Sequence, residues 1–140
     1  MNSLFWSRMH GGATHFPIAL VFAGAFFDML SLLPKRVAGK SEFGILGYWL
    51  IILGALGSFG AVLSGLALSK WTVGGKGLVL WHHLFVWPAF TLIVGLGTWR
   101  FLVGAKPPQY AFVVYLATLL VSCGLIGVAG FFGGEMLLGQ

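Results

Sequence analysis

The sequence predicts an all-α integral membrane protein that folds as one four-helix bundle with up-down-up-down topology. Charged residues make up only 8% of the 140 positions, against roughly 25% in an ordinary soluble domain. Hydrophobic residues make up 59%, and they gather in four apolar runs that each reach the ~20 residues needed to cross a bilayer as a helix. No run shows the alternation of polar and apolar residues expected of membrane β-strands. This composition excludes a soluble enzyme, a disordered tail and a nucleic-acid-binding protein.

The first two predicted spans are bounded by proline and lysine. The first span covers residues 14–33 and ends at Pro34, which a Lys-Arg pair follows. Pro17 fits a helix that starts shortly before it, because proline is tolerated in the first turn, where its missing N–H would bond nothing. The second span covers residues 45–69, between a polar stretch and Lys70.

The last two predicted spans follow breaks rich in glycine and proline. The third covers residues 78–103 after the Gly-rich turn at 74–77, and the fourth covers residues 111–138 after the break at 104–108. Connections this short force neighbouring helices to run antiparallel. Residues 1–140 are therefore expected to form a single transmembrane domain.

The distribution of basic residues predicts how the bundle is oriented. The end of the third span and the connections after the first and third spans hold five of them: Lys35, Arg36, Lys40, Arg100 and Lys106. The N-terminal segment and the middle connection hold three: Arg8, Lys70 and Lys76. Cytoplasmic loops carry an excess of lysine and arginine, so both termini are expected outside the cytoplasm.

All four histidines are expected near one face of the membrane. His10 and His15 precede or begin the first span, and His82 and His83 lie near the start of the third, which runs in the same direction. Glu135, near the end of the antiparallel fourth span, returns to this face. Ionisable groups at membrane depth are costly and usually functional, so this convergence predicts a site.

Paired histidines on separate helices are typical of a b-type haem, whose iron takes two axial imidazoles. We expect His15 and either His82 or His83 to be these ligands. His10 is a second candidate ligand, a partner for a haem propionate or a surface residue. Met9 or Met136 in place of one histidine would give a His/Met pair of higher potential.

Helix periodicity favours one of the two neighbouring histidines slightly. Adjacent positions differ by about 100°, so only one of His82 and His83 can point to the bundle axis, and Arg100 lies about five whole turns after His82. If Arg100 turns inward to pair with Asp28, the only acid expected at that depth, His82 turns inward as well. If Arg100 instead extends to the headgroups, the choice stays open.

Two stripes of glycine recur at every third position. They comprise Gly54, Gly57 and Gly60 in the second span and Gly124, Gly127, Gly130 and Gly133 in the fourth. Small residues of this kind allow close helix packing in membranes, or they leave room for a porphyrin. Arg8 or Lys76 would then neutralise the haem propionates.

The segment His10-Gly11-Gly12-Ala13-Thr14-His15-Phe16-Pro17-Ile18-Ala19-Leu20 resembles the opening of a bacterial four-helix membrane family known as domain of unknown function 2231. The resemblance extends to Asp28, to a histidine early in the third helix and to the segment Gly133-Gly134-Glu135. Gly11 stands where the family usually has proline. The resemblance implies a bacterial inner-membrane location and, through the family's association with cytochromes, redox work.

These observations together predict a small b-type cytochrome-like subunit of a larger respiratory or redox complex, with haem b as cofactor and no catalytic residues of its own. Its expected partners are the lipid bilayer and other membrane or periplasmic redox subunits. One alternative is a haem-free subunit that packs or anchors a complex through its glycine faces. Another is a transition-metal site, since imidazole and carboxylate bind such metals. Its candidate ligands are His10, His15, His82, His83 and Glu135.

Overall fold

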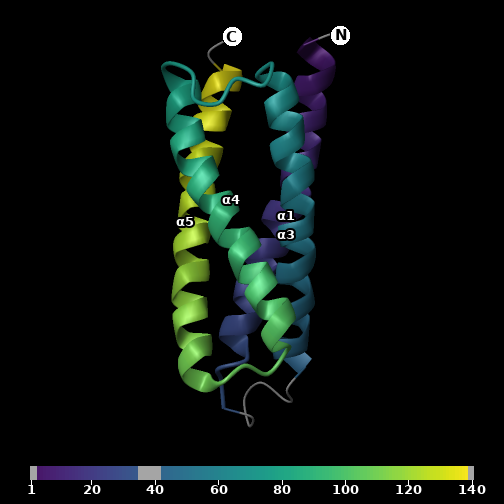
Figure 1. Cartoon of the computed structure of the whole chain (residues 1–140), viewed down its shortest axis with the longest axis vertical. Coiled ribbons are helices and arrows are strands. Elements are labelled where there is room, and N and C mark those ends of the chain that lie inside the picture. The colour runs from purple at the N-terminus through teal and green to yellow at the C-terminus, as the bar shows by residue number, and fades with distance from the viewer. Residues whose placement is uncertain (1–2, 35–41, 139–140) are drawn as a thin grey trace.

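The chain forms four long antiparallel helices and no strand over residues 3–34 and 42–138, which the computed structural model describes. The helices are α1 (Ser3–Leu30), α3 (Glu42–Leu68), α4 (Leu78–Val103) and α5 (Gln109–Leu138). Each is long and apolar enough to cross a membrane. The predicted all-α membrane bundle is therefore confirmed, and Figure 1 shows the two ends of the chain at the same end of the bundle. We call this end the terminal end and the opposite one the loop end.

The first helix begins earlier than the sequence suggested. α1 starts at Ser3 and not near Thr14, so Pro17 lies inside the helix. Interior proline is tolerated in membrane helices because neighbouring helices and side chains satisfy the freed backbone groups. Here Pro17 packs against α3, where a Cβ added to Gly57 would lie 3.3 Å from the proline Cβ. The earlier start brings His10 into the helix.

The other helices lie close to the predicted spans. α4 has the predicted bounds, while α3 and α5 begin a few residues earlier than expected. The basic residues Lys35, Arg36 and Lys40, on which the predicted orientation partly rests, lie outside the described residues.

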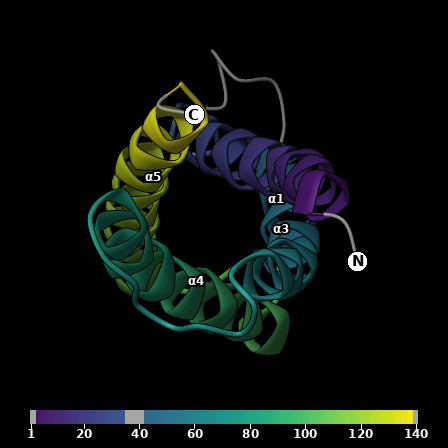
Figure 2. The same cartoon turned by 90° about the horizontal axis from the view of Figure 1, so that it is seen from above.

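Glycine lets α1 and α3 pack closely. A Cβ added to Gly24 would lie 2.8 Å from Ile51 Cγ1, and one added to Gly54 would lie 2.8 Å from Val21 Cγ2. Most of the α3 stripe therefore serves helix packing, although Gly60 has nothing within 4 Å. Figure 2 shows the four helices arranged in a ring, with α1 beside α3 and α4 beside α5.

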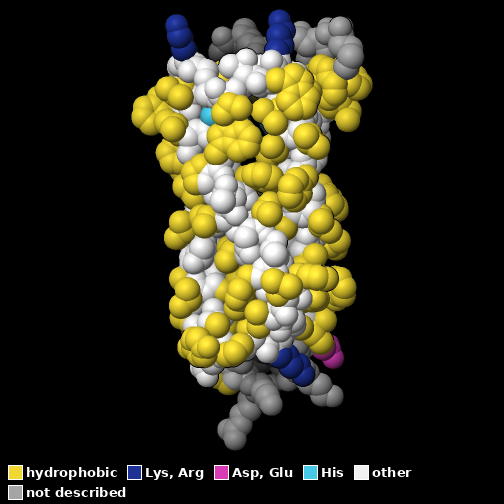
Figure 3. Space-filling view, in the orientation of Figure 1, with side chains coloured by type: hydrophobic (Ala, Val, Ile, Leu, Met, Phe, Trp, Pro, Cys, Tyr) yellow, Lys and Arg dark blue, Asp and Glu magenta, His cyan; other side chains and the backbone are white. Residues whose placement is uncertain are grey.

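Apolar side chains fill the middle of the bundle and also cover its sides. Val21, Ile51 and Leu119 are almost completely buried in the core. Outside, hydrophobic side chains cover the lateral face, and Lys and Arg stand at the two ends (Figure 3). This distribution is typical of a bundle whose sides contact lipid. The polar side chains buried inside it require a specific explanation, because lipid and core alike offer them no water.

Candidate functional site

A buried ion pair joins α1 and α4 near the loop end. Arg100 Nη2 lies 2.8 Å from Asp28 Oδ1, and both side chains are 0% exposed. Of the two alternatives that the sequence leaves for Arg100, the structure thus shows the inward one, paired with Asp28. The pair forms because a lone charge at this depth would be costly, and each residue is the other's counter-ion.

Further groups from α3 and α5 complete this ion pair. The hydroxyl of Tyr115 donates to Asp28 Oδ2 over 2.8 Å, and Arg100 Nη2 also donates to the Gly44 carbonyl over 3.2 Å. Gly47 leaves the space that the carboxyl group occupies, since a Cβ there would lie 2.6 Å from Asp28 Cγ. Tyr115 was not among the site residues predicted from the sequence. The available signal was a phenol inside an apolar span, where a hydroxyl needs a hydrogen-bond partner.

The guanidinium of Arg100 keeps unused donors. Its Nε and Nη1 are buried and have no hydrogen-bond partner within the described residues. Aromatic rings surround it instead, with Cζ 5.1 Å from the centroid of Tyr115, 5.2 Å from Phe112 and 5.9 Å from Tyr48. Cation–π contacts stabilise the charge over the ring faces, but they do not satisfy N–H groups in the guanidinium plane.

Two histidines from different helices face each other near the terminal end. The ring centroids of His10 on α1 and His82 on α4 are 6.4 Å apart, with the planes at 85°. His10 Nδ1 lies 3.1 Å from the Ala61 carbonyl and 3.1 Å from Ser64 Oγ. His82 Nδ1 lies 2.8 Å from the Ala129 carbonyl on α5. All four helices therefore contribute to the site.

These contacts determine the tautomer of each ring. A carbonyl oxygen only accepts hydrogen bonds, so Nδ1 must carry the proton in both His10 and His82. Ser64 Oγ donates to the Ala61 carbonyl over 2.8 Å, which leaves its lone pairs to accept from His10. In the neutral rings Nε2 is then the unprotonated nitrogen. Neither Nε2 has a hydrogen-bond partner in the part of the chain that the structure describes.

The His10 ring lies so close to α3 that a side chain at Gly65 would collide with it. A Cβ added to Gly65 would lie 2.9 Å from His10 Cε1, whereas one added to Gly133 would meet His82 at an ordinary 3.5 Å. Gly65 is therefore required for the position of His10. In α5, Gly124, Gly127 and Gly130 have nothing within 4 Å, so only Gly133 of that stripe borders a histidine.

The remaining predicted site residues lie apart from this pair. His15 is exposed, and its Nδ1 bonds the Gly11 carbonyl of its own helix. Five residues turn a helix by about 140°, so His15 points away once His10 faces α3. His83 turns to the α3–α4 connection, where Gly74 N lies 3.0 Å from its Nδ1.

Glu135 is exposed, and Met9 is 46% exposed. Among residues 3–34 and 42–138, no group of three or more His, Cys, Asp or Glu side chains is placed to hold a metal ion. The structure therefore does not bring together His10, His15 and Glu135, or the wider ligand set expected for a transition metal.

Comparison with known proteins gives one match. A family model described as "Predicted membrane protein (DUF2231)" matches residues 8–139, a range that includes both the histidine pair and the ion pair. No curated protein and no solved structure matches the chain.

Proposed function

The chain belongs to the DUF2231 family of predicted membrane proteins, and we propose that it is a small b-type cytochrome-like electron-transfer subunit whose haem lies between His10 and His82. One observation carries this proposal. Two imidazoles from different helices face each other inside the bundle, each with Nδ1–H donated to a backbone carbonyl and Nε2 unpartnered among the described residues.

The pair supplies the two imidazoles from separate helices that would hold a b-type haem iron, and their ring centroids lie 6.4 Å apart. Metal-binding histidines usually donate their other N–H to a carbonyl or carboxylate, which fixes the ring and makes the ligand more basic. Ala61 and Ala129 supply these carbonyls here.

The chain's own residues would hold and shield the cofactor. Ser64 and the Ala61 carbonyl orient His10, while the Ala129 carbonyl orients His82. The bound haem would supply one-electron transfer. Arg8 and Lys76, both exposed on segments at the terminal end, would neutralise its propionates. Other membrane or periplasmic redox subunits would donate and accept the electrons.

Replacing Gly65 by Ala tests this proposal. The added Cβ would meet His10 Cε1 at 2.9 Å and displace the ring. We expect haem retention to fall about tenfold or more, because even outer-shell changes cost 10–100-fold in metal affinity. Gly60→Ala on the same helix is the control, since nothing lies within 4 Å of that position. Absence of haem from the wild type, or equal retention in both variants, would contradict the proposal.

We also propose that the terminal end faces the periplasm of the bacterial inner membrane, because five of the eight basic residues of the sequence fall at the end of the third span or in the connections after the first and third spans, and such an excess marks the cytoplasmic side. Reporter fusions at Ala38 and Lys106 should then give cytoplasmic signals, and a fusion at Gly75 a periplasmic one. The reverse pattern would overturn the orientation while leaving the bundle intact.

A second candidate function is a haem-free subunit that packs a larger membrane complex. The outer face of α5 favours it, because Gly124, Gly127 and Gly130 have nothing within 4 Å and would allow a helix of another subunit to approach closely. Stable co-purification with such a subunit in the absence of haem would favour this function over the first.

A further inference from the structure

His15 presents an available nitrogen on the outer face of α1. Its ring is exposed, and its Nδ1 bonds the Gly11 carbonyl of its own helix. Because a carbonyl only accepts hydrogen bonds, Nδ1 carries the proton and the lone pair of Nε2 is available. Nε2 has no hydrogen-bond partner among the described residues. His15 thus shares with His10 and His82 the arrangement that is usual for a metal-binding imidazole.

This imidazole lies at a depth where lipid offers it no polar partner. Pro17 packs beside Gly57, which is about 16 Å from the end of α3 at Leu68 for a rise of about 1.5 Å per residue. His15 precedes Pro17 by two positions, so it lies roughly 13 Å below that end. The hydrocarbon layer is about 30 Å thick, and an ionisable group that faces it is rare and usually functional.

The positions around His15 suit a flat apolar ligand with acidic groups at one edge. Gly11 and Gly12, about one turn before His15, have nothing within 4 Å of an added Cβ, so the helix surface there is open. Arg8 lies almost two whole turns before His15 on the same helix face, about 10 Å away along the axis, and is exposed at the terminal end. A haem has iron for Nε2, an apolar ring to lie over the glycines and propionates to reach Arg8.

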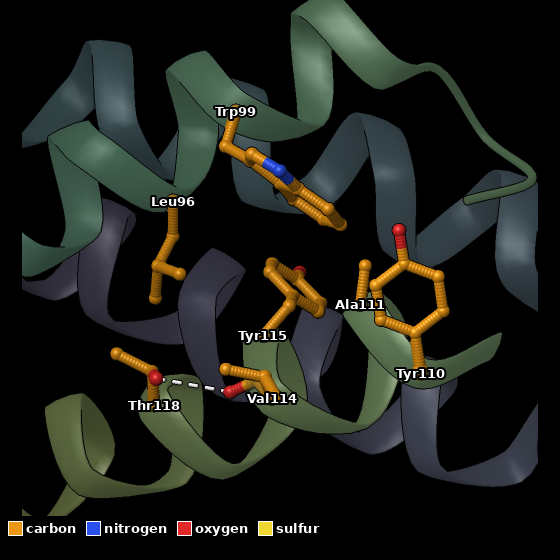
Figure 4. Close-up of a pocket in the computed structure, with 7 residues that line it drawn as sticks. All are labelled: Leu96, Trp99, Tyr110, Ala111, Val114, Tyr115 and Thr118. Atoms are coloured by element: carbon orange, nitrogen blue, oxygen red, sulfur yellow. Dashed lines mark hydrogen bonds between the residues drawn. The ribbon is translucent and has the colours of Figure 1, made fainter. Parts of the chain in front are cut away.

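The pocket between α4 and α5 offers no comparable ligand. Figure 4 shows Trp99 and Leu96 of α4 facing residues of α5. This lining contains aromatic rings but no imidazole, and the Thr118 hydroxyl donates to the Val114 carbonyl of its own helix. Among the described residues, His15 is the one exposed histidine.

We propose that the outer face of α1 is where haem from the bilayer first binds this protein, with His15 as its only protein ligand. This role rests on the proposed function, because the haem then passes to His10 and His82. Those two imidazoles hold the iron together and so bind it more tightly than one exposed imidazole does. His15 therefore speeds loading but is not a ligand in the loaded protein, and Arg8 meets the propionates before the haem reaches the pair.

Zinc protoporphyrin IX tests this site separately from the inner pair, because its zinc takes a single axial ligand. Apoprotein carrying both His10→Ala and His82→Ala is placed in nanodiscs, and binding of the probe is followed by the shift of its Soret band against empty nanodiscs. We expect saturable binding of one probe per chain. Adding His15→Ala should weaken this binding about tenfold or more, because the zinc loses its ligand. Adding His83→Ala instead, whose ring bonds Gly74, should leave it unchanged.

The dimethyl ester of the same probe tests the contribution of Arg8. Arg8→Ala should weaken binding of the free acid about threefold, the usual size of an exposed ion pair, and should leave binding of the ester unchanged.

The rate of haem uptake tests the same role in protein that keeps His10 and His82. Apoprotein with the single change His15→Ala should take up haem about tenfold more slowly than the wild type, the factor by which the first binding step weakens, and should reach the same final spectrum. This comparison does not need the double variant, so it decides the matter even if that variant fails to fold.

Three results would overturn the loading site: no Soret shift in the double variant, equal affinity after His15→Ala is added, or an unchanged rate of haem uptake in His15→Ala. Absence of haem from the wild type would instead contradict the proposed function. The zinc probe would then still show whether His15 binds a metalloporphyrin.

Discussion

Replacing Asp28 by Ala is expected to destabilise the protein by about 3–5 kcal/mol, the usual cost of removing one partner of a buried ion pair. The substitution leaves the guanidinium of Arg100, which is 0% exposed, without a counter-ion and with still more unpaired donors. It also leaves the Tyr115 hydroxyl without its acceptor. Cys123 is the only cysteine and is buried, so its reaction with a fluorogenic thiol probe reports unfolding in detergent.

The double variant shows whether Asp28 and Arg100 stabilise the protein as a pair or independently of each other. Adding Arg100→Leu to Asp28→Ala removes the buried charge and should recover a large part of the lost stability, because an apolar replacement of a buried ion pair is often neutral. Glu42→Ala, an exposed acid at the same end of the bundle, is the control and should change little. Strictly additive losses in the double variant would show that the two residues do not act as a pair.

The histidine variants have the second large expected effect. His10→Ala and His82→Ala should each lose haem, or convert it to a high-spin form, with retention falling by roughly tenfold or more. His15→Ala should keep the wild-type spectrum, because that ring is exposed and bonds only its own helix. His83→Ala should also be mild, since its ring contacts Gly74 in the α3–α4 connection.

Visible absorption spectra of the four purified variants measure how much haem each one retains and so check the expected ranking. Loss of haem from His15→Ala with full retention in His10→Ala would show that the ring facing His82 in the structure is not the ligand. The four measurements also discriminate between His82 and His83, which the sequence left open.

The bundle could be predicted from the sequence because membrane insertion imposes simple requirements. Each span must be long and apolar, and four such runs stand out between Gly-, Pro- and Lys-rich breaks. The Asp28–Arg100 pair was predictable for a related reason. Few ionisable residues occur in the spans, so each has few partners to choose from.

The histidine geometry could be predicted only in part. Helix periodicity relates His82 to Arg100, and the structure turns both inward. Pro17 gave a misleading signal, since proline so often begins a helix. A start near Thr14 left His10 outside the helix, whereas the helix from Ser3 turns His10 toward α3 and His15 away from it.

Apart from the Asp28–Arg100 pair, contacts between helices could not be derived from the sequence pattern. Neither the bond from Tyr115 to Asp28 nor the pocket between α4 and α5 has a sequence signal beyond aromatic residues in an apolar run. Both depend on how far the helices are rotated and separated. The absence of a side chain at glycines such as Gly47 and Gly65 sets the rotation and separation of the helices.

The electron paramagnetic resonance spectrum of the oxidised wild-type protein, purified with its haem, tests the central proposal most directly. If His10 and His82 both hold the iron, the spectrum should show low-spin ferric haem, since two imidazoles are then its protein ligands. The expected stoichiometry is one haem per chain. A protein that takes up no haem, or a spectrum dominated by high-spin iron, would contradict ligation by His10 and His82.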